Sequence, residues 1–82
     1  VIHTPGHTPG SICLQYRNRI FTGDTLLRRG IGTTLMPGSS RRQLIASIRN
    51  RLLVLPDDTV VLPGHGRETT IGEERVHNRY LN

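Results

Sequence analysis

Three side chains able to bind a metal ion each follow an apolar run and a tight turn in this chain of 82 residues. They are His7, Asp24 and His65, and they end the segments 1–7, 20–24 and 60–65. Short β-branched or aromatic runs bounded by glycine and proline are typical of buried strands. Each segment therefore predicts a strand with one polar residue at its tip. Two imidazoles and one carboxylate presented in this way predict a metal site.

Each of these residues taken alone also has a purely structural interpretation. A single histidine is commonly exposed or packed without a ligand, and an aspartate after glycine commonly forms a turn. The metal hypothesis depends on the joint occurrence of the three turns. Asp24 supports it further, because a charge at a buried strand end is costly without a cation. The two oxygens of its carboxylate can bind one ion or bridge two.

The elements that must position these residues are predicted from hydrophobic pattern and turn residues. Strands are expected at the start of the chain and over 11–15, 19–22 and 59–62, with the second and third paired as a hairpin. Residues 26–38 are glycine-rich and lack clear periodicity, which predicts a surface loop of the kind that borders substrate pockets.

Two helices are predicted from capping boxes that begin at Ser40 and Thr70. The first is expected to end at Leu55, because the residue before a proline is driven out of the helical region. The second is expected to end near Asn78. The first helix carries an apolar stripe that predicts its buried face, and the stripe consists of Leu44, Ile45, Ile48 and Leu52. This order of elements predicts one α/β domain, with a mixed sheet and helices on one face.

Composition limits the classes of partner and compartment. The net charge is +5 and all eleven basic residues are arginine. These arginines are scattered and aromatic residues are few, so we expect a solvated basic surface rather than a nucleic-acid interface. Cys13 is the single cysteine, which excludes a disulfide within the chain and predicts a reducing, cytoplasmic location. No apolar run approaches the roughly 20 residues that span a membrane.

The same residues also carry a resemblance to a known family. The stretches 3–11, 21–25 and 63–66 read HTPGHTPGS, FTGDT and PGHG, and they resemble the later motifs of the metallo-β-lactamase superfamily. The stretches 36–40 and 69–74 read MPGSS and TTIGEE, and they resemble its glyoxalase II-like hydrolase branch. The resemblance implies the second half of an αβ/βα sandwich. It thus implies that residues 1–82 are the C-terminal portion of such a domain, without the N-terminal half.

The resemblance also implies a site with two divalent metal ions, with zinc expected and iron or manganese as alternatives. In that site, His7 binds the first ion, Asp24 bridges both ions and His65 binds the second, whereas His3 is not a ligand. Family members carry an earlier His-x-His-x-Asp-His motif, which has no match here. No catalytic residue beyond the metal ligands is expected, and the substrate-binding residues stay unassigned.

The implied activity is hydrolysis of a small-molecule thioester or ester, with hydroxyacyl-glutathione as the preferred class, through a metal-activated hydroxide. Because three ligands cannot complete a two-metal site, we expect the intact protein to be an enzyme and these 82 residues alone to be inactive. Three alternatives stay open. They are a mono-iron dioxygenase of the same fold, a nucleic-acid-processing member favoured by the positive charge, and a non-catalytic binding module.

Other residues are given supporting or structural roles. We expect Cys13 to be a buried, inert thiol and His77 to be exposed on the last helix. His3 is expected to support the loop that carries His7. Residues 32–39 read GTTLMPGS where the glyoxalase II-like branch often has GRTDLPGG, a departure expected to affect local loop packing or substrate preference.

Overall fold

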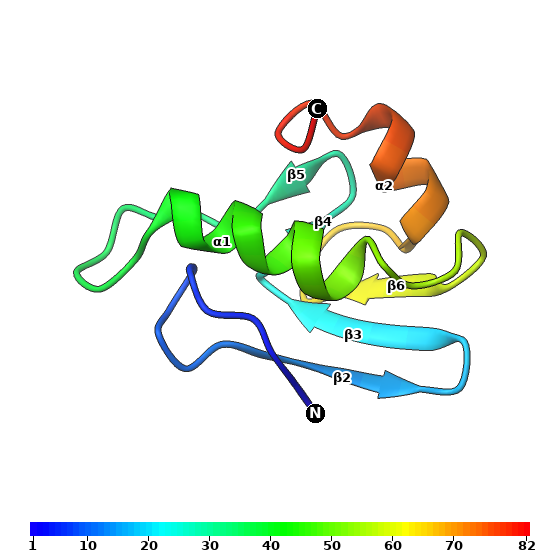
Figure 1. Cartoon of the computed structure of the whole chain (residues 1–82), viewed down its shortest axis with the longest axis horizontal. Coiled ribbons are helices and arrows are strands. Elements are labelled where there is room, and N and C mark those ends of the chain that lie inside the picture. Colours follow the sequence, from blue (N-terminus) through cyan, green and yellow to red (C-terminus); the bar gives the residue numbers. More distant parts are fainter.

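A five-stranded mixed sheet forms the centre of the computed structural model, which describes residues 1–82 (Figure 1). Its strand order is β1 (Ile2–His3), β2 (Ile12–Tyr16), β3 (Arg19–Gly23), β6 (Val60–Pro63) and β7 (Thr69–Thr70). Neighbouring strands run antiparallel, except that β3 and β6 run parallel. The predicted hairpin is confirmed, since β2 pairs with β3. The parallel pair brings the ends of β3 and β6 to the same edge of the sheet.

A second sheet of two short strands corrects the prediction of a surface loop over residues 26–38. Strand β4 (Leu26–Leu27) pairs antiparallel with β5 (Gly30–Ile31). The turn between them includes Arg29 in a left-handed conformation, with φ of 58°. Strands of two residues are too short to show an alternating pattern, which explains why the sequence did not indicate them.

Both predicted helix starts are confirmed. The Ser40 hydroxyl accepts from the Gln43 N–H at 3.2 Å before α1 (Arg41–Ser47), and the Thr70 hydroxyl caps α2 (Ile71–His77) in the same way. Helix α1 continues directly into a π-helical turn, η1 (Ile48–Leu52), and therefore ends before the predicted Leu55. The Leu53 carbonyl accepts instead from the Arg75 guanidinium of α2. In a longer helix this carbonyl would accept from a backbone N–H of the next turn, and here the guanidinium takes the place of that donor.

One cluster of nine buried apolar residues joins the sheet to the helices. The segment α1–η1 lies across one face of the sheet (Figure 1). Its predicted stripe is confirmed, because Leu44, Ile48 and Leu52 are fully buried and Ile45 packs against them. The cluster consists of Cys13, Ile20, Leu26, Leu44, Ile48, Leu52, Val61, Ile71 and Leu81.

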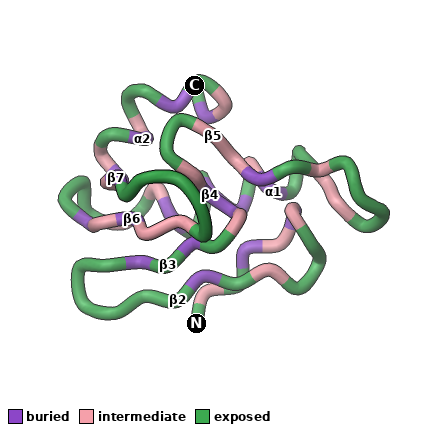
Figure 2. Tube along the Cα trace, turned by 180° about the vertical axis from the view of Figure 1, so that it is seen from behind, coloured by how far each residue is buried: buried purple, intermediate pink, exposed green.

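The opposite face of the β2–β3 hairpin is apolar and open to solvent. Ile12 and Leu14 are each 47% exposed, and Phe21, which belongs to the neighbouring strand, is 48% exposed. Figure 2 shows that most of this hairpin is exposed along its length. Hydrophobic side chains therefore lie on both faces of these strands, whereas the helices cover one. None of the helices combines the length and the apolar content needed to cross a bilayer.

Candidate metal centre

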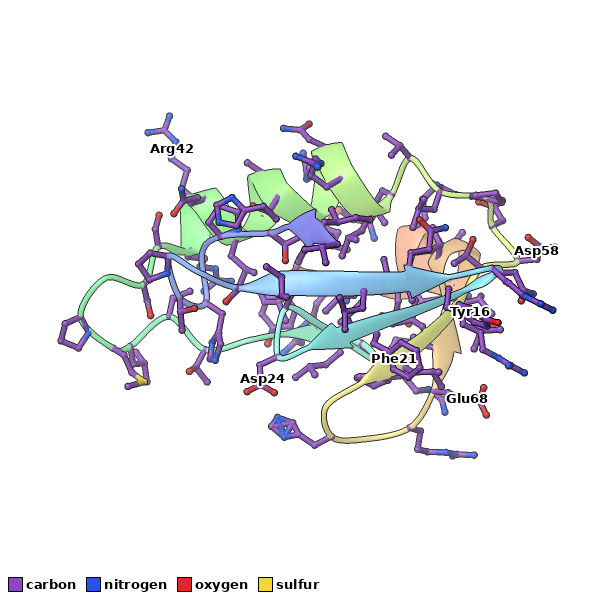
Figure 3. All side chains as sticks on the ribbon, turned by 90° about the horizontal axis from the view of Figure 1, so that it is seen from below. Tyr16, Phe21, Asp24, Arg42, Asp58 and Glu68 are labelled. Carbon is purple, nitrogen blue, oxygen red and sulfur yellow. The ribbon has the colours of Figure 1, made fainter.

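The side chains of His7, Asp24 and His65 meet beside the edge of the sheet where β3 and β6 end. His65 Nε2 donates to Asp24 Oδ1 at 2.5 Å, and His7 Nε2 lies 3.5 Å from Asp24 Oδ2. The three residues line one cavity of about 250 Å³ together with Leu27, Ile31, Gly32 and Thr33. Figure 3 shows Asp24 projecting at this edge. The structure thus brings together all three predicted ligands, and their role toward a metal stays a prediction.

Parallel pairing explains how Asp24 and His65 reach the same place. Asp24 follows the last residue of β3, and His65 lies two residues beyond the end of β6. The Gly64 N–H donates to the Gly23 carbonyl at 2.8 Å and extends the pairing to the two turns. A Cβ at Gly64 would lie 3.2 Å from the Gly23 backbone, so glycine permits this close approach.

His7 is positioned by a loop that is held at several points. His3 Nε2 donates to the Pro9 carbonyl at 2.9 Å, which confirms that His3 supports this loop. The hydroxyl of Ser39 donates to the His7 carbonyl at 2.8 Å, and the Ser40 N–H donates to the Gly6 carbonyl at 2.8 Å. The start of α1 therefore holds the loop from the other side. His7 is the most enclosed of the three, with 20% of its side chain exposed against 65% for His65.

The backbone of Thr33 orients the His7 ring. His7 Nδ1 donates to the Thr33 carbonyl at 2.7 Å, and a carbonyl can only accept. The neutral ring therefore carries its proton on Nδ1 and directs the lone pair of Nε2 toward Asp24, the tautomer that metal-binding histidines use. Sequence reasoning missed this partner, because any residue at position 33 would supply the same carbonyl.

Gly32 lies between His7 and Asp24, and sequence reasoning missed it as well. A Cβ at this position would lie 1.9 Å from the Asp24 carbonyl oxygen and 3.0 Å from His7 Nδ1. No side chain fits there, so Gly32 keeps the two residues at their observed separation. The glycine content of residues 26–38 was the available signal, but several glycines share that segment.

The donor atoms of this cluster fit divalent metal ions. The lone pair of His7 Nε2 faces a carboxylate oxygen at 3.5 Å, and two acceptors facing each other need a cation or proton between them. Two ligands about 2.1 Å from one tetrahedral zinc ion are about 3.4 Å apart. The gap between His7 and Asp24 therefore matches an ion, whereas the shorter His65–Asp24 hydrogen bond has to open to admit one.

The Asp24 carboxylate lies between the two imidazoles. The two imidazoles contact different oxygens of the Asp24 carboxylate. No group of three or more His, Cys, Asp or Glu side chains is arranged so that together they hold one ion. A metal ion at this site would be held by an Asp24 oxygen together with His7 or with His65.

Two other residues with metal-binding chemistry lie outside this site. Cys13 is fully buried in the core, as predicted. Burial raises the pKa of the Cys13 thiol, although hydrogen bonds with Thr4 and Thr25 oppose the shift. The thiol is therefore kept in its neutral, unreactive form. His77 is exposed on α2, as predicted, and lies 3.5 Å from Glu73.

Comparison with known proteins shows a consistent family relationship. The family model described as the metallo-beta-lactamase superfamily matches residues 1–65. The hydroxyacylglutathione hydrolase GloC of Haemophilus influenzae is 46% identical over 84 residues, an alignment that covers 100% of this chain and 40% of GloC. A curated relative from Mycobacterium bovis is 56% identical and is covered over only 38% of its length. The chain thus spans less than half the length of the curated relatives it matches.

Solved structures agree with this relationship. The B3 metallo-beta-lactamase BLEG-1 superposes with a TM-score of 0.94 and 46% identity, covering 98% of this chain and 39% of that protein. A di-iron-bound form of TTHA1623 superposes with a TM-score of 0.90 and 43% identity, covering 96% of this chain and 40% of that protein. The expected fold class is confirmed as an α/β fragment of this fold, with a mixed sheet and two helices.

Proposed function

Because this chain belongs to the metallo-β-lactamase superfamily, we propose that the intact protein is a metal-dependent hydrolase of thioesters such as hydroxyacyl-glutathione. The observation that carries the proposal is the contact of the Asp24 carboxylate with both His7 and His65. Similarity to a hydroxyacylglutathione hydrolase over the whole chain supports the substrate class. The superfamily relationship alone supports only the coarser statement that the relatives are metallo-hydrolases.

In this proposal His7, Asp24 and His65 hold two divalent ions, zinc or iron. When bound, such ions make a water molecule acidic at neutral pH and polarise the carbonyl of the substrate. The chain's own residues prepare the site for this chemistry. Thr33 keeps the His7 ring in the tautomer that offers Nε2, and Gly32 leaves no side chain between His7 and Asp24. The di-iron form of TTHA1623 keeps iron as an alternative to zinc.

Further ligands are required beyond those in this chain. A catalytic zinc ion usually has three protein ligands and one water, so two ions need more donors than one carboxylate and two imidazoles supply. We propose that residues 1–82 form the C-terminal portion of a larger metallo-β-lactamase domain and that its remainder completes both ions. The 82 residues alone are then expected to bind metal weakly and to lack useful turnover.

The test compares Asp24→Asn with Asp58→Asn in the intact protein. Asp24 contacts both histidines, whereas Asp58 is exposed in the turn before β6, well away from the site (Figure 3). Asp24→Asn should lower kcat/KM for S-lactoylglutathione by at least about 100-fold, since even the partners of metal ligands contribute about 10- to 100-fold. Bound metal, measured by elemental analysis, should fall in parallel, and Asp58→Asn should change neither quantity.

Metal removal provides the second arm of this experiment. Treatment with a chelator should abolish hydrolysis, and added zinc or iron should restore it. Hydrolysis that persists in the metal-free protein would refute the proposal. Oxygen uptake with a thiol substrate by the iron-loaded protein, in the absence of thioester hydrolysis, would favour the dioxygenase alternative.

A further inference from the structure

A second cavity adjoins the metal centre, and the positively charged side chain of Arg41 forms part of its lining. It has a volume of about 260 Å³ and lies between the segment 31–35, the first residue of α1 and the C-terminal segment. Gly32 forms part of its wall. The other lining residues are Ile31, Thr33, Thr34, Leu35, Arg41 and Tyr80. We call this cavity the Arg41 pocket.

The Arg41 pocket and the metal centre share a wall. Ile31, Gly32 and Thr33 line both cavities. Thr33 also contacts His7 directly, because its carbonyl accepts from His7 Nδ1 at 2.7 Å. A molecule whose reacting bond lies at the metal centre can therefore extend along residues 31–33 toward Arg41.

Arg41 is the single charged group of the pocket. It forms no ion pair with an acidic side chain, and no acidic residue lines the pocket. The Arg41 guanidinium lies 5.3 Å from the centre of the Tyr80 ring, a contact that holds the side chain in place without neutralising its charge. Such a guanidinium keeps its donors available for a planar anion.

Tyr80 is itself held firmly by the core. Its N–H donates to the Asn78 side-chain oxygen at 3.1 Å, and Asn78 is fully buried. The next residue, Leu81, belongs to the apolar core cluster. The backbone that carries the Tyr80 ring is therefore fixed in place, which reduces the entropy lost when a ligand binds.

The other lining residues of the pocket indicate which class of ligand it suits. Ile31, Leu35 and Tyr80 provide apolar surface, and the hydroxyls of Thr33 and Thr34 can pair with polar groups of a flexible chain. We propose that the Arg41 pocket binds the carboxylate-bearing end of the substrate, with Arg41 as a specificity-determining residue. This inference rests on the proposed function, because it assumes that the reacting bond lies at His7, Asp24 and His65.

The experiment measures binding of S-methylglutathione, a thioether that cannot be hydrolysed, and of its uncharged-carboxyl analogue, the diethyl ester. Isothermal titration of the intact protein should show tighter binding of the acid than of the ester. Arg41→Ala should weaken binding of the acid about tenfold, as expected for one charge-assisted contact that is partly exposed, and should leave the ester unchanged. Arg41→Lys should lie between Arg41→Ala and the unmodified protein.

Arg42→Ala is the matched control. Arg42 is the next residue of α1 and carries the same charge, but it does not line the pocket and projects away from Asp24 (Figure 3). It should leave the binding of both ligands unchanged. An equal effect of the Arg41 and Arg42 substitutions would reduce the result to net charge and overturn the proposal. Equal binding of acid and ester by the unmodified protein, or an equal loss of both in Arg41→Ala, would overturn it too.

Failure of the proposed function has a different signature. Titrations with the metal-free protein report on the Arg41 pocket without any turnover, whereas metal content and hydrolysis report on the centre. Selective loss of acid binding in Arg41→Ala, in a protein that hydrolyses no thioester, would support the pocket and refute the hydrolase. Hydrolysis without any dependence on Arg41 would support the hydrolase and refute the pocket.

Discussion

At the scale of single residues, backbone groups set the geometry of this site as much as the side chains of the proposed ligands do. The Thr33 carbonyl selects the His7 tautomer, and the bare Cα of Gly32 permits His7 and Asp24 to approach each other. Neither effect depends on a polar side chain. Supporting positions of this kind can govern a metal centre, because ligand atoms have to stay within a few tenths of an ångström of their required places.

Gly32→Ala tests this dependence. The added methyl group would collide with the Asp24 carbonyl and press on the His7 ring, so we expect a loss of stability of about 1–3 kcal/mol together with weaker zinc binding. Gly10→Ala is the control, since a Cβ there meets nothing within 4 Å. Urea unfolding and zinc titration measure the two effects. Unchanged zinc affinity in Gly32→Ala would show that position 32 does not shape the site.

At the scale of elements, α2 anchors the β4–β5 hairpin that leads to Gly32. Glu74 of α2 is fully buried and accepts from the Arg29 N–H at 2.7 Å and from the Arg29 guanidinium at 2.6 Å. Thr69 and Asn78 also donate to this carboxylate, at 2.6 and 3.0 Å. A buried charge is tolerated here because both carboxylate oxygens of Glu74 accept hydrogen bonds. The hairpin turn is thereby fixed against the C-terminal helix.

Glu74→Gln should therefore destabilise the protein by about 2 kcal/mol or more, because it removes the charge that pairs with Arg29 and turns an amide N–H₂ toward other donors. Glu73→Gln provides the comparison. Glu73 lies 3.6 Å from the same guanidinium but is about half exposed, so its loss should cost less than about 1 kcal/mol. Denaturant unfolding of both variants measures the difference. Equal effects would contradict the anchoring role of Glu74.

At the scale of the whole molecule, the sheet has one covered and one open face. The helices bury the side that includes Cys13, Ile20 and Val61, whereas Ile12, Leu14 and Phe21 stay about half exposed. Exposed apolar surface on strands favours association with other surfaces. The isolated chain of 82 residues is therefore expected to self-associate through this face.

Leu14→Gln and Phe21→Gln should each reduce that self-association. These residues pair directly across β2 and β3, so either change places a polar group in the middle of the open face. Val76→Gln is the control, because Val76 is exposed on α2, away from this surface. Sedimentation velocity at several protein concentrations measures the effect. Association that responds equally to all three substitutions would exclude the open face as its cause.

The sequence was sufficient for the features that depend on neighbouring residues. The apolar runs before Asp24 and His65 indicated strand tips with polar residues, and Ser40 and Thr70 indicated where the helices begin, because strand alternation and capping are local effects. The same prediction was wrong for His7, because β1 ends at His3 and His7 lies in the loop that follows. The short strands β4 and β5 could not be predicted, since two residues cannot show a period. The early end of the first helix was missed for a different reason, because the Leu53 carbonyl beyond it pairs with Arg75 of α2, a contact between residues far apart in the chain.

Tertiary structure alone decided how those local pieces form a site. The parallel pairing of β3 with β6 places Asp24 beside His65, and the packing of the loop on α1 brings His7 to the same carboxylate. Gly32, the Thr33 carbonyl and the joining of Arg41 with Tyr80 in one pocket became visible only in the folded chain. These contacts join residues far apart in the chain, often through backbone atoms that every residue shares. Local sequence patterns therefore cannot predict these contacts, which form only when the chain folds.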